Sequence, residues 1–190
     1  MYVRLEVVHV RTLVKPSVQV VGIEDWRVLV EDKDGVVREL GLGWVAEKNK
    51  YFLDIAEITY LVYKDFCEVL IENRKTDLAS LYSRFPQMDY AWSKFTVLLD
   101  LRERGRRAKS GFSPRELFYT KGSEKVLVLV LEENTLIQAS KIVEWVKSAI
   151  MREFTPVIAI VDAHGDVTYY SASLSRAQDL SRVYLDESSS

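Results

Sequence analysis

The stretch Phe95-Thr-Val-Leu-Leu-Asp-Leu-Arg-Glu-Arg-Gly105-Arg-Arg-Ala-Lys-Ser-Gly111 divides the chain. Trp92, just before it, begins an apolar pattern that continues through Phe95, Leu98 and Leu99 at helical spacing. Gly105 stands where a left-handed residue would cap the C-terminus of such a helix. The stretch therefore predicts a long helix that ends at Gly105 and leads into strands.

Two apolar runs downstream predict buried strands. Residues 126–131 form an unbroken run, which is typical of a strand covered on both faces, and residues 157–161 form a second run. Between them, Thr135 and Gln138 suggest a capping box, so we expect a helix to begin there. Its apolar residues recur at positions 136, 139, 143, 146 and 150. The three elements predict a strand-helix-strand unit with parallel strands and a right-handed crossover.

The first half of the chain reads as a small sheet followed by helices. We expect strands at Val3–Val10, Val18–Val21, Trp26–Val30 and Val36–Leu40, with Asp34-Gly35 as a hairpin turn. A metal nuclease can hold Mg²⁺ on a pattern such as Glu31-Asp-Lys33. No second carboxylate is placed to share the ion, so we interpret this pattern as a solvated hairpin tip.

The segment before the long helix is also patterned. Residues 53–65 predict an amphipathic helix, and Phe66–Ile71 a strand. Thr76-Asp77 begins a further helix that Pro86 ends.

Composition limits the classes of function. Of the 190 residues 48% are apolar, which suffices for a folded core, and the formal net charge is −2. Proteins that hold RNA mainly through its phosphates are usually basic overall, so any RNA contact needs a local basic patch or a partner. The single cysteine excludes an internal disulfide, and no apolar run has the length of a membrane span. We expect no signal peptide, a cytoplasmic protein and no membrane partner.

Four motifs follow one another in the second half: Leu-Arg-Glu-Arg-Gly (101–105), Ser-Gly-Phe (110–112), Tyr-x-x-Gly (119–122) and Ile-Ala-Ile-Val-Asp-x-x-Gly-Asp-Val-Thr-Tyr-Tyr (158–170). This ordered set resembles the C-terminal domain of archaeal tRNA-splicing endonucleases. Residues 53–63 and 85–104 are similar to the N-terminal part of the same proteins. The resemblance implies cleavage of precursor tRNA at intron boundaries in a bulge-helix-bulge RNA. The products would carry 2′,3′-cyclic phosphate and 5′-hydroxyl ends, and no metal or other cofactor is implied.

The resulting expectation is an α+β fold. A small N-terminal α/β domain spans residues 1–90. A C-terminal mixed-sheet, nuclease-like domain with one crossover helix spans 91–173, and 174–190 form a C-terminal extension. Because the boundary falls at the long helix, we expect the two domains to be rigidly joined.

The resemblance also implies a catalytic tyrosine, histidine and lysine. Attack of a ribose 2′-hydroxyl on its phosphate needs a base, an acid for the leaving 5′-oxygen and a cation beside the charged phosphorane. Tyr119 takes the tyrosine position as a relic. The histidine interval holds only Ser123-Glu-Lys125, and the lysine interval holds only Arg152-Glu-Phe-Thr-Pro156. We therefore expect a structural subunit, inactive alone, that assembles with a catalytic subunit into a heterotetramer.

Six cationic residues lie between positions 102 and 115: Arg102, Arg104, Arg106, Arg107, Lys109 and Arg115. They are either a solvated face that complements the helix dipole or a site for RNA phosphate or an acidic loop. In the family, the loop that corresponds to Asp162–Asp166 inserts into a basic pocket of a neighbouring subunit, which implies interface roles for Asp162 and Asp166. The following strand pairs two subunits, which implies interface roles for Val167, Tyr169 and Tyr170.

Two other functions stay open. The chain is a self-sufficient endonuclease if displaced residues such as Lys125, Lys147 or His164 supply the missing groups. It is an RNA-independent scaffold if only assembly persists. His164 lies beyond the crossover helix from Tyr119 in sequence order, which disfavours it as an acid, and His9 is expected to be a packed or surface residue.

Overall fold

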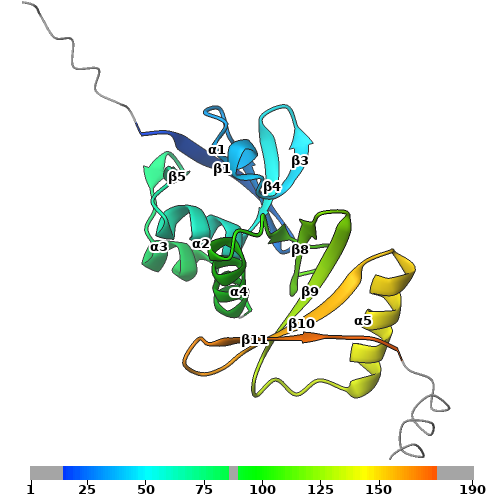
Figure 1. Cartoon of the computed structure of the whole chain (residues 1–190). Helices are drawn as coiled ribbons and strands as arrows, with labels where there is room; N and C mark the ends of the chain where they lie inside the picture. The colour runs from blue at the N-terminus through cyan, green and yellow to red at the C-terminus, as the bar shows by residue number, and fades with distance from the viewer. Residues whose placement is uncertain (1–14, 86–89, 175–190) are drawn as a thin grey trace, which may run out of the picture.

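Two mixed β-sheets, one from each half of the chain, lie on either side of a central helix (Figure 1). The computed structural model describes residues 15–85 and 90–174. The predicted strand at Val3–Val10, His9 and nearly all of the predicted extension at 174–190 lie outside these described residues. An α+β fold with two mixed sheets confirms the predicted fold class.

The first sheet has the strand order β3-β4-β2-β1-β5-β6. Its strands are β1 (Ser17–Glu24), β2 (Arg27–Glu31), β3 (Trp44–Glu47), β4 (Lys50–Asp54), β5 (Glu68–Ile71) and β6 (Arg74–Lys75). The helices of this half are α1 (Val36–Leu40), α2 (Ile55–Tyr63) and α3 (Leu78–Arg84). Only β1 and β5 pair in parallel, and the other pairs are antiparallel.

The second sheet has the order β11-β10-β9-β8-β7. Its elements are β7 (Lys109–Ser110), β8 (Glu116–Lys121), β9 (Glu124–Glu132), α5 (Ala139–Met151), β10 (Thr155–Val161) and β11 (Val167–Ser171). The predicted parallel pairing of the two apolar runs is confirmed, with Val126 opposite Thr155 and Val130 opposite Ala159. Residues 126–131 are buried, as a strand covered on both faces requires.

The central helix is α4 (Ala91–Glu103), which the opening stretch predicts. Gly105 is left-handed with φ 76°, and the amide of Arg106 donates to the carbonyl of Leu101, which completes a Schellman cap. Phe95, Leu98 and Leu101 are buried. The helix packs on α2 on one side and on the second sheet on the other, so it belongs to both halves.

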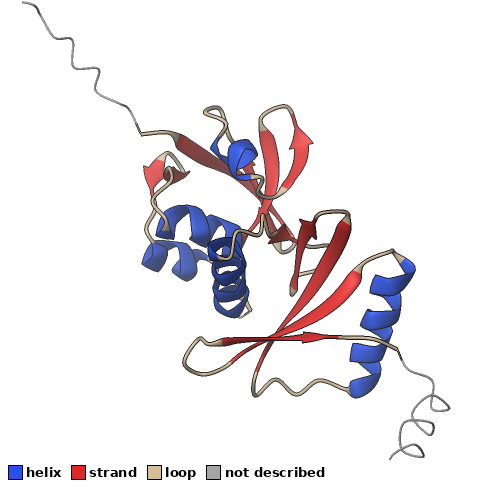
Figure 2. Ribbon diagram, viewed as in Figure 1, coloured by secondary structure: helices blue, strands red, loops and turns tan. Residues whose placement is uncertain are grey.

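Helix α5 covers the opposite face of the second sheet from α4 (Figure 2). The predicted capping box at its start is wrong, because the helix begins four residues later, at Ala139. Thr135 instead closes a turn after β9, where its amide donates to the carbonyl of Glu132. Gln138 is the N-cap residue but makes no side-chain capping bond.

Residues 36–40 form a short helix, so the predicted strand and hairpin turn are wrong. The carboxylate of Asp32 accepts hydrogen bonds from the amides of Val36, Val37 and Arg38, which caps a helix rather than extending a strand. Gly35 reaches the left-handed region with φ 81° just before it. Asp32 is consequently buried, and the interpretation of this segment as a solvated tip is also wrong.

The hairpin formed by β3 and β4 was not predicted. It takes Leu53 into a strand, so the helix expected over residues 53–65 is confined to Ile55–Tyr63. The strand expected at Phe66–Ile71 is the shorter β5, and α3 begins after Asp77 as predicted.

Candidate functional site

Tyr119 lies on the face of the second sheet that α4 covers. It pairs with Val126 and borders a cavity of about 280 Å³ under the C-terminal end of α4. The cavity is lined by Leu101, Arg104, Arg106, Tyr119, Val157, Tyr169 and Ser171. Burial raises the pKa of Tyr119, and the charge of Arg106 opposes that rise.

The strand register brings the intervals expected for histidine and lysine next to Tyr119. Tyr119 lies opposite Val126, and Val126 lies opposite Thr155. Glu124 precedes Val126 by two residues and therefore points to the same face. The hydroxyl of Thr155 donates to the carboxylate of Glu124 over 2.8 Å. Tyr119, Glu124 and Thr155 thus form a group that consists of a phenol, a carboxylate and a hydroxyl.

The β8–β9 hairpin leaves no loop in which a displaced histidine would fit. Lys121 pairs directly with Glu124, and the turn needs the left-handed Gly122 with φ 61°. Lys125 is adjacent to Glu124 and points to the opposite face.

The other displaced candidates lie elsewhere. Lys147 is on α5, across the sheet from Tyr119. His164 follows the C-terminal end of β10, whereas Thr155 begins that strand, so about 20 Å of strand separates them. The structure does not bring Lys125, Lys147 or His164 to Tyr119.

Three of the six clustered cations hold carbonyl groups of the N-terminal half. Arg102 donates to the carbonyls of Ala108 and Leu40, over 2.8 and 3.1 Å. Arg107 donates to the carbonyl of Glu39 over 2.7 Å. The ammonium of Lys109 donates to the carbonyl of Gly43 and lies 3.6 Å from the ring centre of Trp44. Burial lowers the pKa of Lys109. Through these hydrogen bonds, the three side chains connect the two halves of the chain.

The remaining three cations differ from one another. Arg104 is exposed and donates to the carboxylate of Asp100 over 2.8 Å. Arg106 is half-buried at the cavity edge. Arg115 is half-buried, with its guanidinium 5.9 Å from the ring of Tyr90. The six cations therefore do not form one continuous surface.

The two aspartates of the 162–166 turn have different environments. The carboxylate of Asp162 accepts hydrogen bonds from the amides of His164 and Asp166, over 2.8 and 2.9 Å. The bond from Asp166 is the main reason that the pKa of Asp162 lies below its usual value. Asp166 is exposed and makes no side-chain hydrogen bond within the described ranges. Asp162 thus shapes the turn, and the exposed Asp166 borders a cavity that α4 also lines.

Among the described strands, β11 is an edge of the second sheet and pairs only with β10. Val167 and Tyr169 are partly buried against the core, and Tyr170 is 52% exposed on the other face. The Tyr169 hydroxyl donates to Asp100 over 2.7 Å, which ties β11 to α4. No strand within residues 15–85 and 90–174 pairs with the other edge of β11, and an unpaired edge of this kind can receive a further strand.

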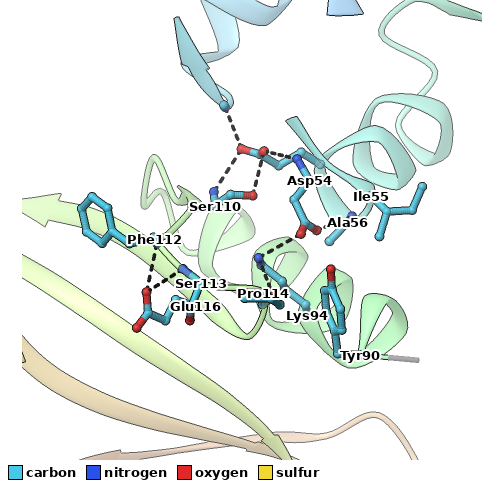
Figure 3. Close-up of polar contacts among 12 residues, drawn as sticks. Asp54, Ile55, Ala56, Tyr90, Lys94, Ser110, Phe112, Ser113, Pro114 and Glu116 are labelled. Atoms are coloured by element: carbon cyan, nitrogen blue, oxygen red, sulfur yellow. Dashed lines mark hydrogen bonds and ion pairs between the residues drawn. The ribbon is translucent and has the colours of Figure 1, made fainter. Parts of the chain in front are cut away.

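A buried polar network at the junction of the two halves was not predicted (Figure 3). We call Asp54, Glu57, Lys94 and Ser110 the junction network. Glu57 accepts four hydrogen bonds, from the amides of Gly43, Asp54 and Ser110 and from the Ser110 hydroxyl. Lys94 donates to Asp54 over 3.1 Å and to the carbonyl of Pro114 over 2.9 Å.

The sequence held one signal for this network. Asp54 and Glu57 stand at the spacing of a capping box, and that box is present at the start of α2. The bonds of Glu57 to Gly43 and Ser110 link residues far apart in sequence, and local spacing does not indicate them.

Within residues 15–85 and 90–174, no group of three or more His, Cys, Asp or Glu side chains is arranged to hold a metal ion. No helix in these ranges has the length and apolar character needed to cross a membrane.

Comparison with known proteins agrees with the motifs. A family model described as tRNA intron endonuclease, catalytic C-terminal domain, matches residues 91–169. The chain is 34% identical over 143 residues to a tRNA-splicing endonuclease of Thermococcus gammatolerans, covering 72% of this chain and 84% of the relative. A tRNA-splicing endonuclease of Methanococcus vannielii is 32% identical over 163 residues, covering 78% and 90%. Because these similarities span most of both chains, the protein belongs to the tRNA-splicing endonuclease family.

Proposed function

We propose that this chain is the structural, non-catalytic subunit of a heteromeric tRNA-splicing endonuclease. It assembles with a catalytic subunit, as a heterotetramer, to cleave precursor tRNA at the intron boundaries of a bulge-helix-bulge RNA. The observation that carries the proposal is the group of Tyr119, Glu124 and Thr155, which occupies the region where the family resemblance implies a tyrosine, a histidine and a lysine.

The chemistry of that group supports a non-catalytic role. The group contains neither a histidine nor a lysine, and the cations that line the cavity beside it, Arg104 and Arg106, come from the segment after α4 and not from the lysine interval. A general acid contributes about 10²- to 10⁴-fold, so the missing histidine by itself removes rate on that order. The positions of Lys125, Lys147 and His164 do not offer replacements.

The surfaces expected for assembly support the same proposal. Asp166 is exposed at its turn, and β11 is an edge strand among the described residues and carries the exposed Tyr170. In this proposal Asp166 meets a cation of the catalytic subunit, and the β11 edge pairs with a second subunit. Asp162 acts indirectly, because its carboxylate holds the turn.

The test uses the full chain, a paralogous chain that carries the complete tyrosine, histidine and lysine set, and their mixture. Cleavage of a bulge-helix-bulge precursor tRNA is expected from the mixture and not from this chain alone. In the mixture, Tyr119→Phe in this chain should leave turnover within about twofold, because the phenol takes no part in the reaction. Cleavage by this chain alone, at the rate of the mixture, would show a self-sufficient nuclease. If the paralogue cleaves the RNA equally well with and without this chain, the result would favour the RNA-independent scaffold.

A further inference from the structure

The turn between β1 and β2 borders a cavity that the proposed function does not use. This cavity has a volume of about 290 Å³ and is lined by Glu24, Asp25, Trp26, Arg27 and Phe52. Strand β1 ends at Glu24 and β2 begins at Arg27, so Asp25 and Trp26 form the turn, with Asp25 left-handed at φ 53°. Two carboxylates, two aromatic rings and one guanidinium therefore meet at one small space.

The guanidinium of Arg27 has no hydrogen-bond acceptor among the described residues. Its Nε atom is buried without a partner. Glu24 lies directly opposite Arg27 in the register of β1 and β2, yet the two side chains do not form a salt bridge. The guanidinium instead lies 4.5 Å from the ring centre of Trp26. Buried donors are nearly always paired in proteins, so this arginine indicates a ligand that supplies the acceptor.

The aromatic side of the cavity is held by the rest of the fold. Trp26 is half-buried, and the ammonium of Lys94, in the junction network, lies 5.1 Å from its ring centre. Phe52 pairs with Leu29 in the register of β2 and β4, so Phe52 and Arg27 point to the same face of the first sheet. The stacking surface and the guanidinium are thus in place before a ligand binds.

The mixture of charges at the cavity disfavours a charged group as the ligand. A phosphate or a carboxylate would pair with Arg27 but would be repelled by Glu24 and Asp25. A lysine or arginine side chain would be attracted by the two carboxylates and repelled by Arg27. A neutral group with donors and acceptors on neighbouring edges satisfies all three charges, and a flat one also stacks on Trp26.

We infer that this cavity binds a guanine base. Guanine carries two adjacent acceptors, O6 and N7, which match two N–H groups of the Arg27 guanidinium. Its N1–H and N2–H groups lie on the next edge and can donate to the carboxylate of Glu24. Adenine has a donor, N6, beside N7 and would oppose Arg27. The inference does not depend on the proposed function, because none of the lining residues belongs to the group of Tyr119, Glu124 and Thr155.

Titration calorimetry on the full chain, without a catalytic subunit, tests the inference. The probes are the 5′-monophosphates of guanosine, 7-deazaguanosine and adenosine, which carry the same phosphate, so differences among them report the base. Arg27→Gln removes the guanidinium, and Glu24→Gln removes the charge of an exposed carboxylate. Arg74→Gln is the matched control, because it removes an exposed arginine from β6, an edge strand of the same sheet.

We expect guanosine monophosphate to bind saturably and about tenfold or more tightly than adenosine monophosphate. The 7-deaza probe, which lacks N7, and Arg27→Gln should each lose most of this preference. Glu24→Gln should weaken guanosine monophosphate a few-fold, and Arg74→Gln by less than about twofold. Tighter binding of an adenosine hexanucleotide that contains one guanosine identifies an RNA strand as the source of the base, and equal or weaker binding identifies a free nucleotide; both support the guanine site.

Thermal melting and circular dichroism confirm that each variant is folded, and the 7-deaza probe decides on the unaltered chain if Arg27→Gln does not fold. Three results would overturn the inference: no saturable binding of guanosine monophosphate, equal affinity for guanosine and adenosine monophosphates, and equal losses in Arg27→Gln and Arg74→Gln. These outcomes are separable from failure of the proposed function, because binding is measured without the catalytic subunit and cleavage is measured with it.

Discussion

Replacing Lys94 by methionine should strongly destabilise the protein. Its ammonium and the carboxylate of Asp54 are 3.1 Å apart, and both side chains are fully buried, at 0% exposure. At an effective dielectric constant of about 20, two unit charges at this separation attract by about 5 kcal/mol. Breaking a buried pair by removing one partner typically costs about 3–5 kcal/mol, because the remaining charge stays desolvated.

The matched control is Lys64→Met, which removes the partner of Glu103 in a shorter contact of 2.8 Å at the surface. That loss should be much smaller, because the pair is exposed to solvent, which screens its attraction. The double variant Asp54→Asn with Lys94→Met should recover a large part of the stability lost in Lys94→Met, because Asn still caps α2 and the pair leaves no unpartnered charge behind. Chemical denaturation at neutral pH measures the free energy of unfolding of the unaltered chain, the two single variants and the double variant. Similar losses of unfolding free energy in Lys94→Met and Lys64→Met, or no recovery in the double variant, would contradict a strong buried ion pair.

The pH dependence gives a second measure of the same pair. Burial raises the pKa of Asp54 above its ordinary 3.8, and the attraction of Lys94 opposes that rise. An acid with a raised pKa in the folded state stabilises the protein below its unfolded pKa, and that stability is lost as the pH rises through the folded pKa. Without Lys94 the opposing attraction is gone, so the stability of Lys94→Met should fall more steeply above pH 3.8 than that of the unaltered chain.

Three further predictions concern other contacts. Arg102→Lys should cost about 1–2 kcal/mol in thermal or chemical unfolding, because a lysine cannot reach the carbonyls of Ala108 and Leu40 together; a loss equal to that of an exposed arginine would contradict this. The amide resonances of His164 and Asp166 should titrate with a midpoint below the ordinary 3.8 of an aspartate, because the depressed pKa of Asp162 makes its stabilisation of the turn persist until the pH falls through that lower value. Asp166→Asn should convert the assembled complex to smaller species in light scattering while leaving this chain folded; an intact complex without activity would instead give Asp166 a role in RNA contact or chemistry.

The sequence predicted best where an element has a long, regular pattern. The apolar run at 126–131 and the capped helix ending at Gly105 agree with the structure, since burial and a positive φ each leave a local mark. Short segments were ambiguous. Val36–Leu40 has the β-branched start of a strand, and the carboxylate of Asp32, four residues earlier, decides for a helix. At Thr135 a turn competes with helix capping, and the turn is the one that forms.

The candidate site divides in the same way. Absence of histidine and lysine in their intervals is visible in the sequence, but the contact between Glu124 and Thr155 depends on the parallel register of β9 and β10. The close spacing of six cationic residues between positions 102 and 115 of the sequence suggested a single anion-binding site. Arg102, Arg107 and Lys109 instead bind carbonyls more than 60 positions away, at Leu40, Glu39 and Gly43. Local charge density does not indicate which cations a distant backbone will occupy.

The positions of these contacts explain how a chain of this family can change its catalytic residues and keep its fold. Glu124 and Thr155 lie at strand ends, where a polar substitution removes little packing. The polar contacts between the two halves include the junction network and the three cations bound to carbonyls, and none of these contacts includes Tyr119, Glu124 or Thr155. Residues 162–170, which we assign to assembly, lie at the other end of β10 from Thr155. Chemistry, junction and assembly thus rest on separate residues, so loss of the first leaves the other two intact, as a structural subunit requires.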